Sequence, residues 1–388
     1  MSSIIPSMVD LASVVRPGDG IICGQACAEP QTLLEALVAQ RAQFSGCRVF
    51  LGVNYAGIVK PSHSDHLRLA SYGGIGHNRA LSDAGVLDVL RIPYSRIAAF
   101  IRSGQIRCDV VFVQVSPPNE RGEYSLGLGA DYLVPALQVC RAVVAEVNAQ
   151  VPWTHSERLL RREDFALRIE TSRAPAEARG RAADRAIARH AAAFVADGSV
   201  LEFGIGALPD AVCEFLAARR ALRVHSGTIG DGVVDLMRGG AVSKADCAML
   251  IGSRKLFDFA RDNPRIRLRS SEYTHSAEVL GGIEGFVAIN SAVEVDLQGQ
   301  VNSEIAGGSY VGAIGGAPDF MSAARKRGVS LVLIPASRLV TRLSGPVTIP
   351  ASEAGIVVTE LGAADLRGCD EGERARRLRA IASAHSAV

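Results

Sequence analysis

Two short segments carry side chains that can take part in acyl-transfer chemistry. His225 and Ser226 are neighbours in the run LRVHSGTIGDG; a histidine can act as a general base near neutral pH, and a serine with a base beside it as a nucleophile. Cys27 and Glu29 lie in GQACAEP, where a thiol of lowered pKa or a carboxylate can attack a carbonyl. Each also has a structural interpretation, as a packed strand end, a structural hydroxyl, a small packed thiol and a helix cap. The residues alone leave both interpretations open.

Glycine-rich loops form a second candidate feature, because 39 of the 388 residues are glycine and much of it follows strand-like runs. Gly204 and Gly206 open the run GIGALP, and 315–320 reads GGAPDF. Glycine lets the backbone approach a ligand closely, and its N–H groups can stabilise an oxyanion. The first run lacks the third glycine and the acid of a dinucleotide fingerprint, and no GxxxxGK[ST] motif is present. Tight turns at strand ends are the structural alternative.

Composition excludes several classes of function. The formal net charge is +2, so no charge excess indicates nucleic acid or a membrane surface as a partner. No apolar run is long enough to span a membrane, and the N-terminus lacks the pattern of a signal peptide. Eight dispersed cysteines without a CxxC pair indicate free thiols in a reducing cytoplasm. His63 and His66 form the one close histidine pair and lack a third ligand nearby, so no metal site is predicted.

The elements that must position these residues alternate along the chain between apolar strand-like runs and amphipathic helical stretches. This alternation predicts an α/β fold with a mostly parallel sheet and helices on both faces. The expected strands are 110–115, 143–147, 200–203, 331–334 and 356–358, and the expected helices include 31–40, 130–141 and 183–196.

The chain also predicts two similar halves. The segment 159–183 is arginine-rich, with weak periodicity, and places a domain boundary near residue 180, giving domains 1–180 and 181–388. In each half a strand-like run leads to a glycine loop, a proline near the helix start (Pro30 and Pro209) and an amphipathic helix. Duplicated α/β halves around a central cleft follow from this echo. The alternative is one domain with a long surface excursion.

Taken together, these motifs resemble the acetyl-CoA hydrolase/transferase family, within the class I CoA-transferase fold, over nearly the whole chain. The matching segments are 18–37 (GDGIICGQACAEPQTLLEAL), 113–128 (VQVSPPNERGEYSLGL), 144–152 (VAEVNAQVP), 201–212 (LEFGIGALPDAV), 229–236 (IGDGVVDL), 286–304 (FVAINSAVEVDLQGQVNSE), 315–320 (GGAPDF) and 357–368 (VVTELGAADLRG).

The resemblance implies two CoA-transferase-type α/β domains packed around a cleft that holds the active site. It also implies a homo-oligomer that takes acyl-CoA as a substrate and holds no permanently bound cofactor. In such transferases a glutamate attacks the thioester to form an acyl-glutamyl anhydride, and CoA then attacks this anhydride to leave a glutamyl-CoA thioester. An incoming carboxylate finally takes over the CoA. The residues expected to bind CoA or an oxyanion are Gly204, Gly206, Gly315, Gly316, Asp319 and Phe320.

One departure from the family pattern concerns that glutamate. The family writes it in a motif like His-Thr/Ser-Glu-Met-x-Ser-Asp-Gly, whereas this chain reads HSGTIGDG from His225. The flanks align without a gap, so Gly227 occupies the position of the glutamate. Glycine has no side chain and can form neither covalent intermediate.

Three interpretations follow. In the first, water or another acceptor attacks the thioester directly, giving hydrolysis or acyl transfer. In the second, Glu29 or Glu272 replaces the missing carboxylate and CoA transfer to a carboxylate persists. In the third, the scaffold performs other chemistry on a CoA thioester, as a decarboxylase in this fold class does, or only binds it. The first is the leading prediction.

Overall fold

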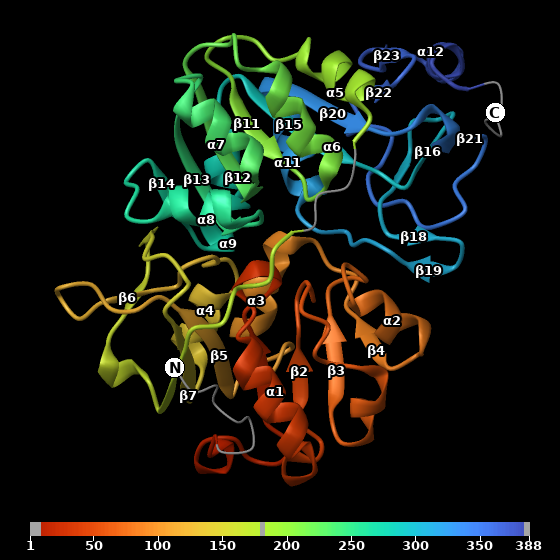
Figure 1. Cartoon of the computed structure of the whole chain (residues 1–388). Helices are drawn as coiled ribbons and strands as arrows, with labels where there is room; N and C mark the ends of the chain where they lie inside the picture. Colours follow the sequence, from red (N-terminus) through yellow and green to blue (C-terminus); the bar gives the residue numbers. More distant parts are fainter. Residues whose placement is uncertain (1–8, 179–182, 384–388) are drawn as a thin grey trace. The chain divides into compact units, whose positions relative to one another are not determined.

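The computed structural model describes residues 9–178 and 183–383. The chain forms two compact units, Met1–Ala178 with Ala248–Glu272 and Arg179–Cys247 with Tyr273–Val388 (Figure 1). The boundary predicted at residue 180 falls outside the described residues. The predicted halves differ from these units in the segment Ala248–Glu272, which the sequence analysis assigned to the C-terminal half.

Backbone hydrogen bonds explain why this segment packs in the first unit. The Ala130 N–H donates to the Ala248 carbonyl at 2.9 Å, and the Leu250 N–H donates to the Leu128 carbonyl at 2.8 Å. The segment contains helix α8 (Arg254–Ala260) and strand β14 (Ile266–Leu268), which pairs in parallel with β8 (His155–Ser156). These pairings are tertiary, so the linear order of the chain does not reveal them.

The first unit is built on a fully parallel sheet. Its central strands are almost entirely buried on both faces, which explains the mostly apolar run VVFVQV. In sheet order the strands are β10 (Leu167–Thr171), β7 (Ala142–Asn148), β5 (Val110–Val115), β1 (Gly20–Cys23), β2 (Arg48–Phe50), β3 (Arg68–Ser71) and β4 (Leu87–Val89). The helices are α1 (Gln31–Gln40), α2 (Asn78–Asp83), α3 (Tyr94–Arg102) and α4 (Leu133–Val139), and β6 (Tyr124–Ser125) pairs with β9 (Leu159–Leu160).

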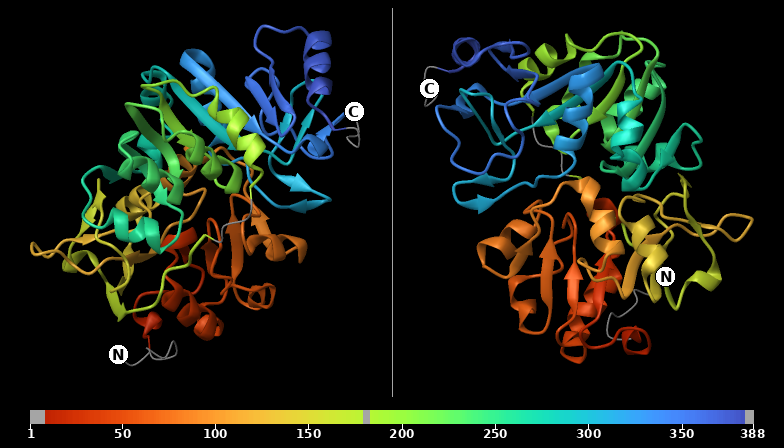
Figure 2. Two further views of the ribbon diagram at one scale, coloured as in Figure 1. Left: turned by 45° about the horizontal axis from the view of Figure 1, so that its top comes forward. Right: turned by 180° about the vertical axis from the view of Figure 1, so that it is seen from behind.

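The second unit has its own sheet, whose strands β11, β15, β20 and β22 pair in parallel. In order, its strands are β23 (Gly362–Asp365), β22 (Ile356–Thr359), β20 (Gly328–Leu333), β15 (Phe286–Ser291), β11 (Val200–Phe203), β12 (Leu222–Ile229) and β13 (Val242–Leu250). Smaller pairings join β16 (Glu294–Asp296) to β17 (Val301–Asn302) and β21 (Leu339–Val340), and β18 (Ile305–Ala306) to β19 (Ser309–Tyr310). Figure 2 shows these strands in green to blue.

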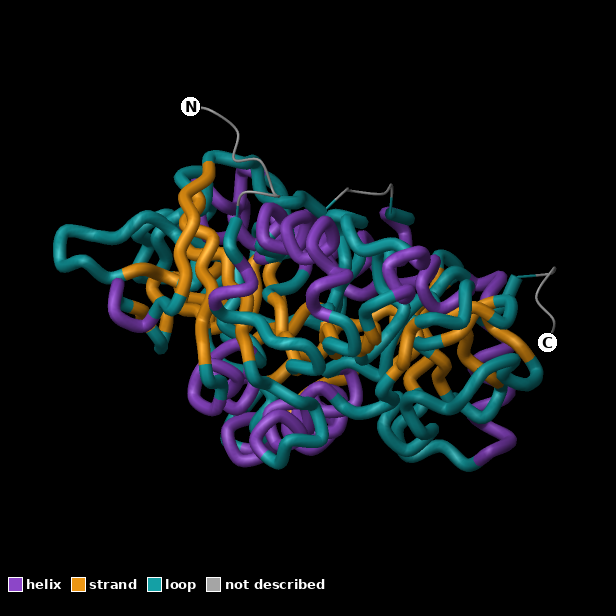
Figure 3. The backbone as a smooth tube through the Cα atoms, turned by 90° about the horizontal axis from the view of Figure 1, so that it is seen from below, coloured by secondary structure: helices purple, strands orange, loops and turns teal. Residues whose placement is uncertain are grey.

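The helices of this unit are α5 (Arg185–Ala192), α6 (Ala207–Val212), α7 (Asp231–Arg238), α10 (Ala277–Gly281), α11 (Ala317–Arg327) and α12 (Glu371–Ala380). The short α9 (Ser271–Thr274) contains the point where the chain passes between units. Helix α11 packs on β15 and β20, and α5 packs on β20 and β22. Figure 3 shows this alternation of strands and helices along the chain.

The expected echo between the halves is visible in the sheets. Strand β1 lies between β5 and β2, and β11 lies between β15 and β12, so the first strand of each pattern is central. The prolines differ, however. Pro30 is the N-cap of α1, whereas Pro209 is the third residue of α6, which begins after Gly206. Helix α6 begins two residues before its proline because Gly206, at φ +141°, ends the strand-to-helix turn directly ahead of the helix.

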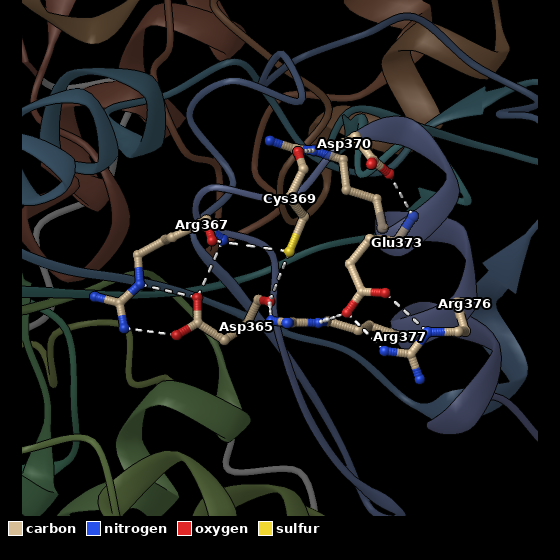
Figure 4. A network of polar contacts seen from close by, with 8 residues as sticks. Asp365, Arg367, Cys369, Asp370, Glu373, Arg376 and Arg377 are labelled. Atoms are coloured by element: carbon tan, nitrogen blue, oxygen red, sulfur yellow. Dashed lines mark hydrogen bonds and ion pairs between the residues drawn. The ribbon is translucent and has the colours of Figure 1, made fainter.

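A charged network fixes the last helix against β23. Asp365 accepts two hydrogen bonds from Arg367, and Glu373 accepts hydrogen bonds from Arg376 and Arg377 (Figure 4). The Arg377 guanidinium also donates to the Asp365 carbonyl at 2.6 Å. The Arg377 bond is the one of these contacts that joins the helix to β23, and Leu378, which is buried in the core of the unit, also anchors the helix.

Glu146 joins strand β7 to the start of helix α1, which follows the first glycine loop. Its carboxylate accepts the Thr32 N–H at 2.8 Å, the Leu33 N–H at 3.1 Å and the Thr32 hydroxyl at 3.1 Å. Helix N–H groups in the first turn otherwise have no partner within the helix. This buried side chain therefore does for α1 what an N-cap residue usually does.

We expect Glu146→Ala to lower the free energy of unfolding by about 1–3 kcal/mol, because it strands two buried N–H groups. Glu146→Gln is the matched control: its amide oxygen can accept both N–H groups and its NH₂ can donate to the Thr32 hydroxyl, so the loss should be less than half as large. Urea unfolding measures both. Equal losses in the two variants would show that capping is not the role of Glu146.

Candidate functional site

Strand β12 is irregular where the motif HSG lies. Leu201 of β11 pairs with Val224, and Phe203 pairs with Thr228. Between these two pairs, β11 advances by two residues and β12 by four. Such a bulge interrupts the backbone ladder and re-aims the residues it contains. It places Gly227 at the turn of the bulge.

The hydroxyl of Ser226 closes the gap that the bulge opens. Its Oγ accepts the Phe203 N–H at 3.1 Å and the Thr228 N–H at 3.2 Å, and it lies 2.6 Å from the Thr228 carbonyl, to which it donates. Ser226 is fully buried. A hydroxyl bound on every side to backbone does not fit the predicted nucleophile, and the structural interpretation of Ser226 is the one that the geometry supports.

Gly227 faces the imidazole of His275. A Cβ at position 227 would lie 3.3 Å from Cε1 and Nε2 of that ring and 3.5 Å from Cε2 of Phe320. A Cβ at Gly316 would lie only 2.4 Å from the same Nε2. Glycine at both positions is what allows the ring to lie where it does.

His275 was not among the residues predicted for the site. Its ring lies 4.5 Å, centroid to centroid, from the ring of Phe320, and its Nδ1 is 2.9 Å from the Thr274 hydroxyl. Burial, with a smaller contribution from the neighbouring His225, lowers the pKa of His275 to about 3, so the ring is neutral at physiological pH. No pattern in the sequence links positions 227 and 275.

His225 is buried and held by the same stretch of chain. Its Nε2 lies 2.9 Å from the Thr274 carbonyl; because a carbonyl only accepts, Nε2 carries the hydrogen. The ring also packs near Tyr273 and Phe286. The buried, packed ring agrees with the packed strand end, and because Nε2 carries the hydrogen, a general base at this residue would have to use Nδ1.

The first glycine loop of this unit is shaped by Asn290. A Cβ at Gly204 would lie 2.4 Å from Asn290 Oδ1, so only glycine fits there. The Asn290 amide donates at 2.7 Å to Glu202, which also accepts the Ile289 N–H at 3.2 Å. Burial raises the pKa of Glu202 to about 8. This buried carboxyl was not among the residues predicted for the site, although its position two residues before Gly204 could have identified it as a candidate.

The remaining residues predicted to bind CoA differ in their settings. Gly315, at φ +59°, has nothing within 4 Å of its Cβ position, and Gly316 is the N-cap of α11. Asp319 stands in the first turn of that helix. The side chain of Phe320 is buried against His275 and Phe286, so its side chain packs the core instead of offering a surface to a ligand.

Two of the candidate nucleophiles lie in the first unit and are buried. Burial raises the pKa of the Cys27 thiol to about 12, so the reactive thiolate is disfavoured. Glu29 accepts the N–H groups of Tyr55 and Ala56, yet burial still raises its pKa to about 8. Cys27 fits its structural interpretation as a packed thiol. Glu29 is a buried structural acid that binds the backbone at Tyr55 and Ala56 and does not cap helix α1.

Glu272, the other candidate carboxylate, is at the surface. It receives two hydrogen bonds from the Arg102 guanidinium, at 2.9 and 2.8 Å. Arg102 also donates to Gln138. This bidentate pair engages both oxygens of the carboxylate.

Residues 9–178 and 183–383 lack both a metal-binding cluster and a membrane-spanning helix. They contain no group of three or more His, Cys, Asp and Glu side chains arranged to hold a metal ion. Among the same residues, no helix combines the length and apolar character needed to cross a membrane.

We expect Ser226→Ala to lower the free energy of unfolding by about 1–3 kcal/mol, because the buried N–H groups of Phe203 and Thr228 lose their acceptor. Ser226→Thr, which keeps the hydroxyl, serves as the control and should lose less. Thermal and urea unfolding measure the difference. Mass spectrometry showing an acyl group on Ser226 after incubation with acyl-CoA would instead establish a nucleophile.

The raised pKa of Glu29 predicts a pH dependence of stability. Between its ordinary value of 4.5 and about 8, the unfolded chain releases the proton while the folded chain keeps it. Stability therefore falls as pH rises through this window, by up to about 1.4 kcal/mol per pH unit for one proton. Glu29→Gln should remove this contribution, whereas the exposed Glu272→Gln should not. Urea unfolding from pH 5 to 8 tests this, and identical slopes in wild type and Glu29→Gln would contradict it.

Comparison with known proteins identifies the family of this chain. Residues 5–159 match the N-terminal domain, and residues 252–387 the C-terminal domain, of acetyl-CoA hydrolase/transferase proteins. The 4-hydroxybutyrate coenzyme A transferase of Clostridium kluyveri is 31% identical over 387 residues, covering 93% of this chain and 90% of that protein.

Two solved structures share the fold. RipA from Yersinia pestis superimposes with a TM-score of 0.92 at 26% identity, covering 98% of this chain and 94% of RipA. The 4-hydroxybutyrate CoA-transferase of Porphyromonas gingivalis gives 0.80 at 29% identity, covering 96% and 92%. The chain therefore belongs to the acetyl-CoA hydrolase/transferase family and is an enzyme of the CoA-transferase and hydrolase type.

Proposed function

We propose that this protein binds an acyl-CoA and transfers its acyl group directly to water, or to another small acceptor, without a covalent glutamyl-CoA intermediate. The proposal is carried by Gly227 in the run HSGTIGDG, at the position where the resemblance leads us to expect the glutamate of the family motif. Hydrolysis is the simplest such reaction because water needs no binding site of its own.

The surroundings of the other candidate acids support the same conclusion. Glu272 is paired with Arg102 at the surface. Glu29 is buried, and its pKa of about 8 leaves it mostly protonated at neutral pH, which makes it a poor nucleophile. Glu29 is therefore buried and mostly uncharged, and both oxygens of Glu272 are engaged by Arg102, so neither acid is placed as a carboxylate nucleophile.

The proposed reaction balances without a covalent enzyme intermediate. The oxygen of water forms a bond to the thioester carbonyl carbon, giving a tetrahedral oxyanion. This oxyanion collapses as the C–S bond breaks, and the proton lost by water ends on the CoA thiolate. Backbone N–H groups of Gly206, Gly315 and Gly316 are the proposed oxyanion and CoA contacts. The Gly204 N–H is not one of them, because it donates to the Ile289 carbonyl at 2.8 Å.

CoA transfer to a carboxylate is the second candidate. It is favoured by the similarity to the Clostridium kluyveri CoA-transferase over 93% of the chain. It needs another acid in place of residue 227, and Glu29 and Glu272 are the residues proposed for that role. A decarboxylase-like reaction and CoA-thioester binding without turnover are the other outcomes that the experiment distinguishes.

The finer features of the proposal concern setting and partners. The substrate is a CoA thioester, the acceptor is a small molecule, and no permanently bound cofactor is expected. We also propose a homo-oligomer in the cytoplasm, because the resemblance implies the first and the dispersed free cysteines favour the second.

Product analysis by mass spectrometry tests the proposal, using purified protein and a panel of acyl-CoAs with and without acetate. We expect free acid and CoA in equal amounts whether or not acetate is present. Glu29→Gln and Glu272→Gln should leave this turnover unchanged, because neither acid enters the reaction. Acetyl-CoA formed only when acetate is added would show CoA transfer and contradict the proposal; loss of that activity in one variant would identify the acid.

A further inference from the structure

We infer that His275 determines which side chains position 227 can hold, and that its imidazole, together with the glycine, keeps a carboxylate nucleophile out of this site. The inference rests on the proposed function, because it explains why no glutamyl-CoA intermediate forms at position 227. It treats residues 227 and 275 as a sterically matched pair, in which the residue at one position limits the residue at the other.

The first support is that two separate glycines face the same ring. The Cβ positions of Gly227 and Gly316 lie 3.3 and 2.4 Å from Nε2 of His275. Side-chain carbons in folded proteins essentially never lie 2.4 Å from a ring atom, and 3.3 Å requires the neighbour to move. One glycine from β12 and one from the α11 N-cap thus both leave room for one imidazole.

The second support is that the ring has little freedom to move away. His275 is 4% exposed. Its Nδ1 is bonded to the Thr274 hydroxyl at 2.9 Å, and one face packs on Phe320, whose ring lies 6.3 Å from Phe286. Close-packed interiors transmit such displacements to their neighbours. A side chain at position 227 must therefore compete with a fixed ring.

The competition is electrostatic as well as steric. A glutamate at position 227 would place its carboxylate beside a buried ring that is neutral at physiological pH. A buried carboxylate without a cation or several hydrogen-bond donors is strongly disfavoured and takes up a proton. Gly227→Glu alone should therefore not create a working nucleophile, whereas the same change combined with a smaller residue at 275 should give it space and water.

A double-mutant cycle tests the steric pair independently of activity. We expect Gly227→Ala to lower the urea midpoint in wild type, and to lower it much less when His275→Ala is already present. Gly316→Ala should be relieved only in part, because its Cβ would also lie 2.9 Å from Cε2 of Phe320. Gly281→Ala is the matched control, since nothing lies within 4 Å of its Cβ position, and its effect should be the same in both backgrounds. Additive midpoints for positions 227 and 275 would overturn the inference.

Activity tests the second half of the inference. We expect Gly227→Glu to form no acetyl-CoA from acetate, and Gly227→Glu combined with His275→Ala to form it. His275→Asn replaces His275→Ala if the alanine variant does not fold, because the asparagine amide can keep the bond to Thr274. Transfer by Gly227→Glu alone, or by neither variant, would overturn the inference. Transfer by the wild type would instead refute the proposed function while leaving the stability cycle to judge the pair.

Discussion

The bulge in β12 is the constraint on which the candidate site depends. Two extra residues between the pairs Leu201–Val224 and Phe203–Thr228 would leave the backbone of β11 unpaired. The Ser226 hydroxyl supplies the missing hydrogen bonds and so holds the bulge in one conformation. Gly227, one residue on, is then presented to His275 and Phe320. A single buried hydroxyl thus holds the stretch of β12 that contains Gly227.

Much of the fold could be predicted because its strands are buried on both faces. Mostly apolar runs predicted β5 and β11 with their observed bounds, and α1 was predicted as observed, 31–40. The helix predicted over 130–141 is shorter, Leu133–Val139, because Asp131 has a positive φ of 22° and Cys140 is extended. These departures depend on tertiary contacts, here the pairing of Ala130 with Ala248, which local periodicity does not contain.

The site was less predictable for a related reason. Gly227 could be singled out because the flanking motif fixes its position in the sequence. His275 could not, because its significance lies in a contact between β12, the end of α9 and the start of α11. Residue type also misled where burial reverses reactivity: Cys27 and Glu29 look reactive in sequence, yet burial raises the pKa of both. The chemistry of such groups follows from desolvation, which requires the folded environment.

Intact-protein mass spectrometry during turnover tests the central claim most directly. The protein is mixed with a slight excess of acyl-CoA, and samples are quenched in acid at intervals. The mass of the intact protein and the amount of CoA released are measured in each sample. Direct attack by water predicts that the thioester is consumed while the protein keeps its own mass at every time point. A population of protein heavier by one CoA moiety would show a covalent enzyme–CoA thioester and contradict the account.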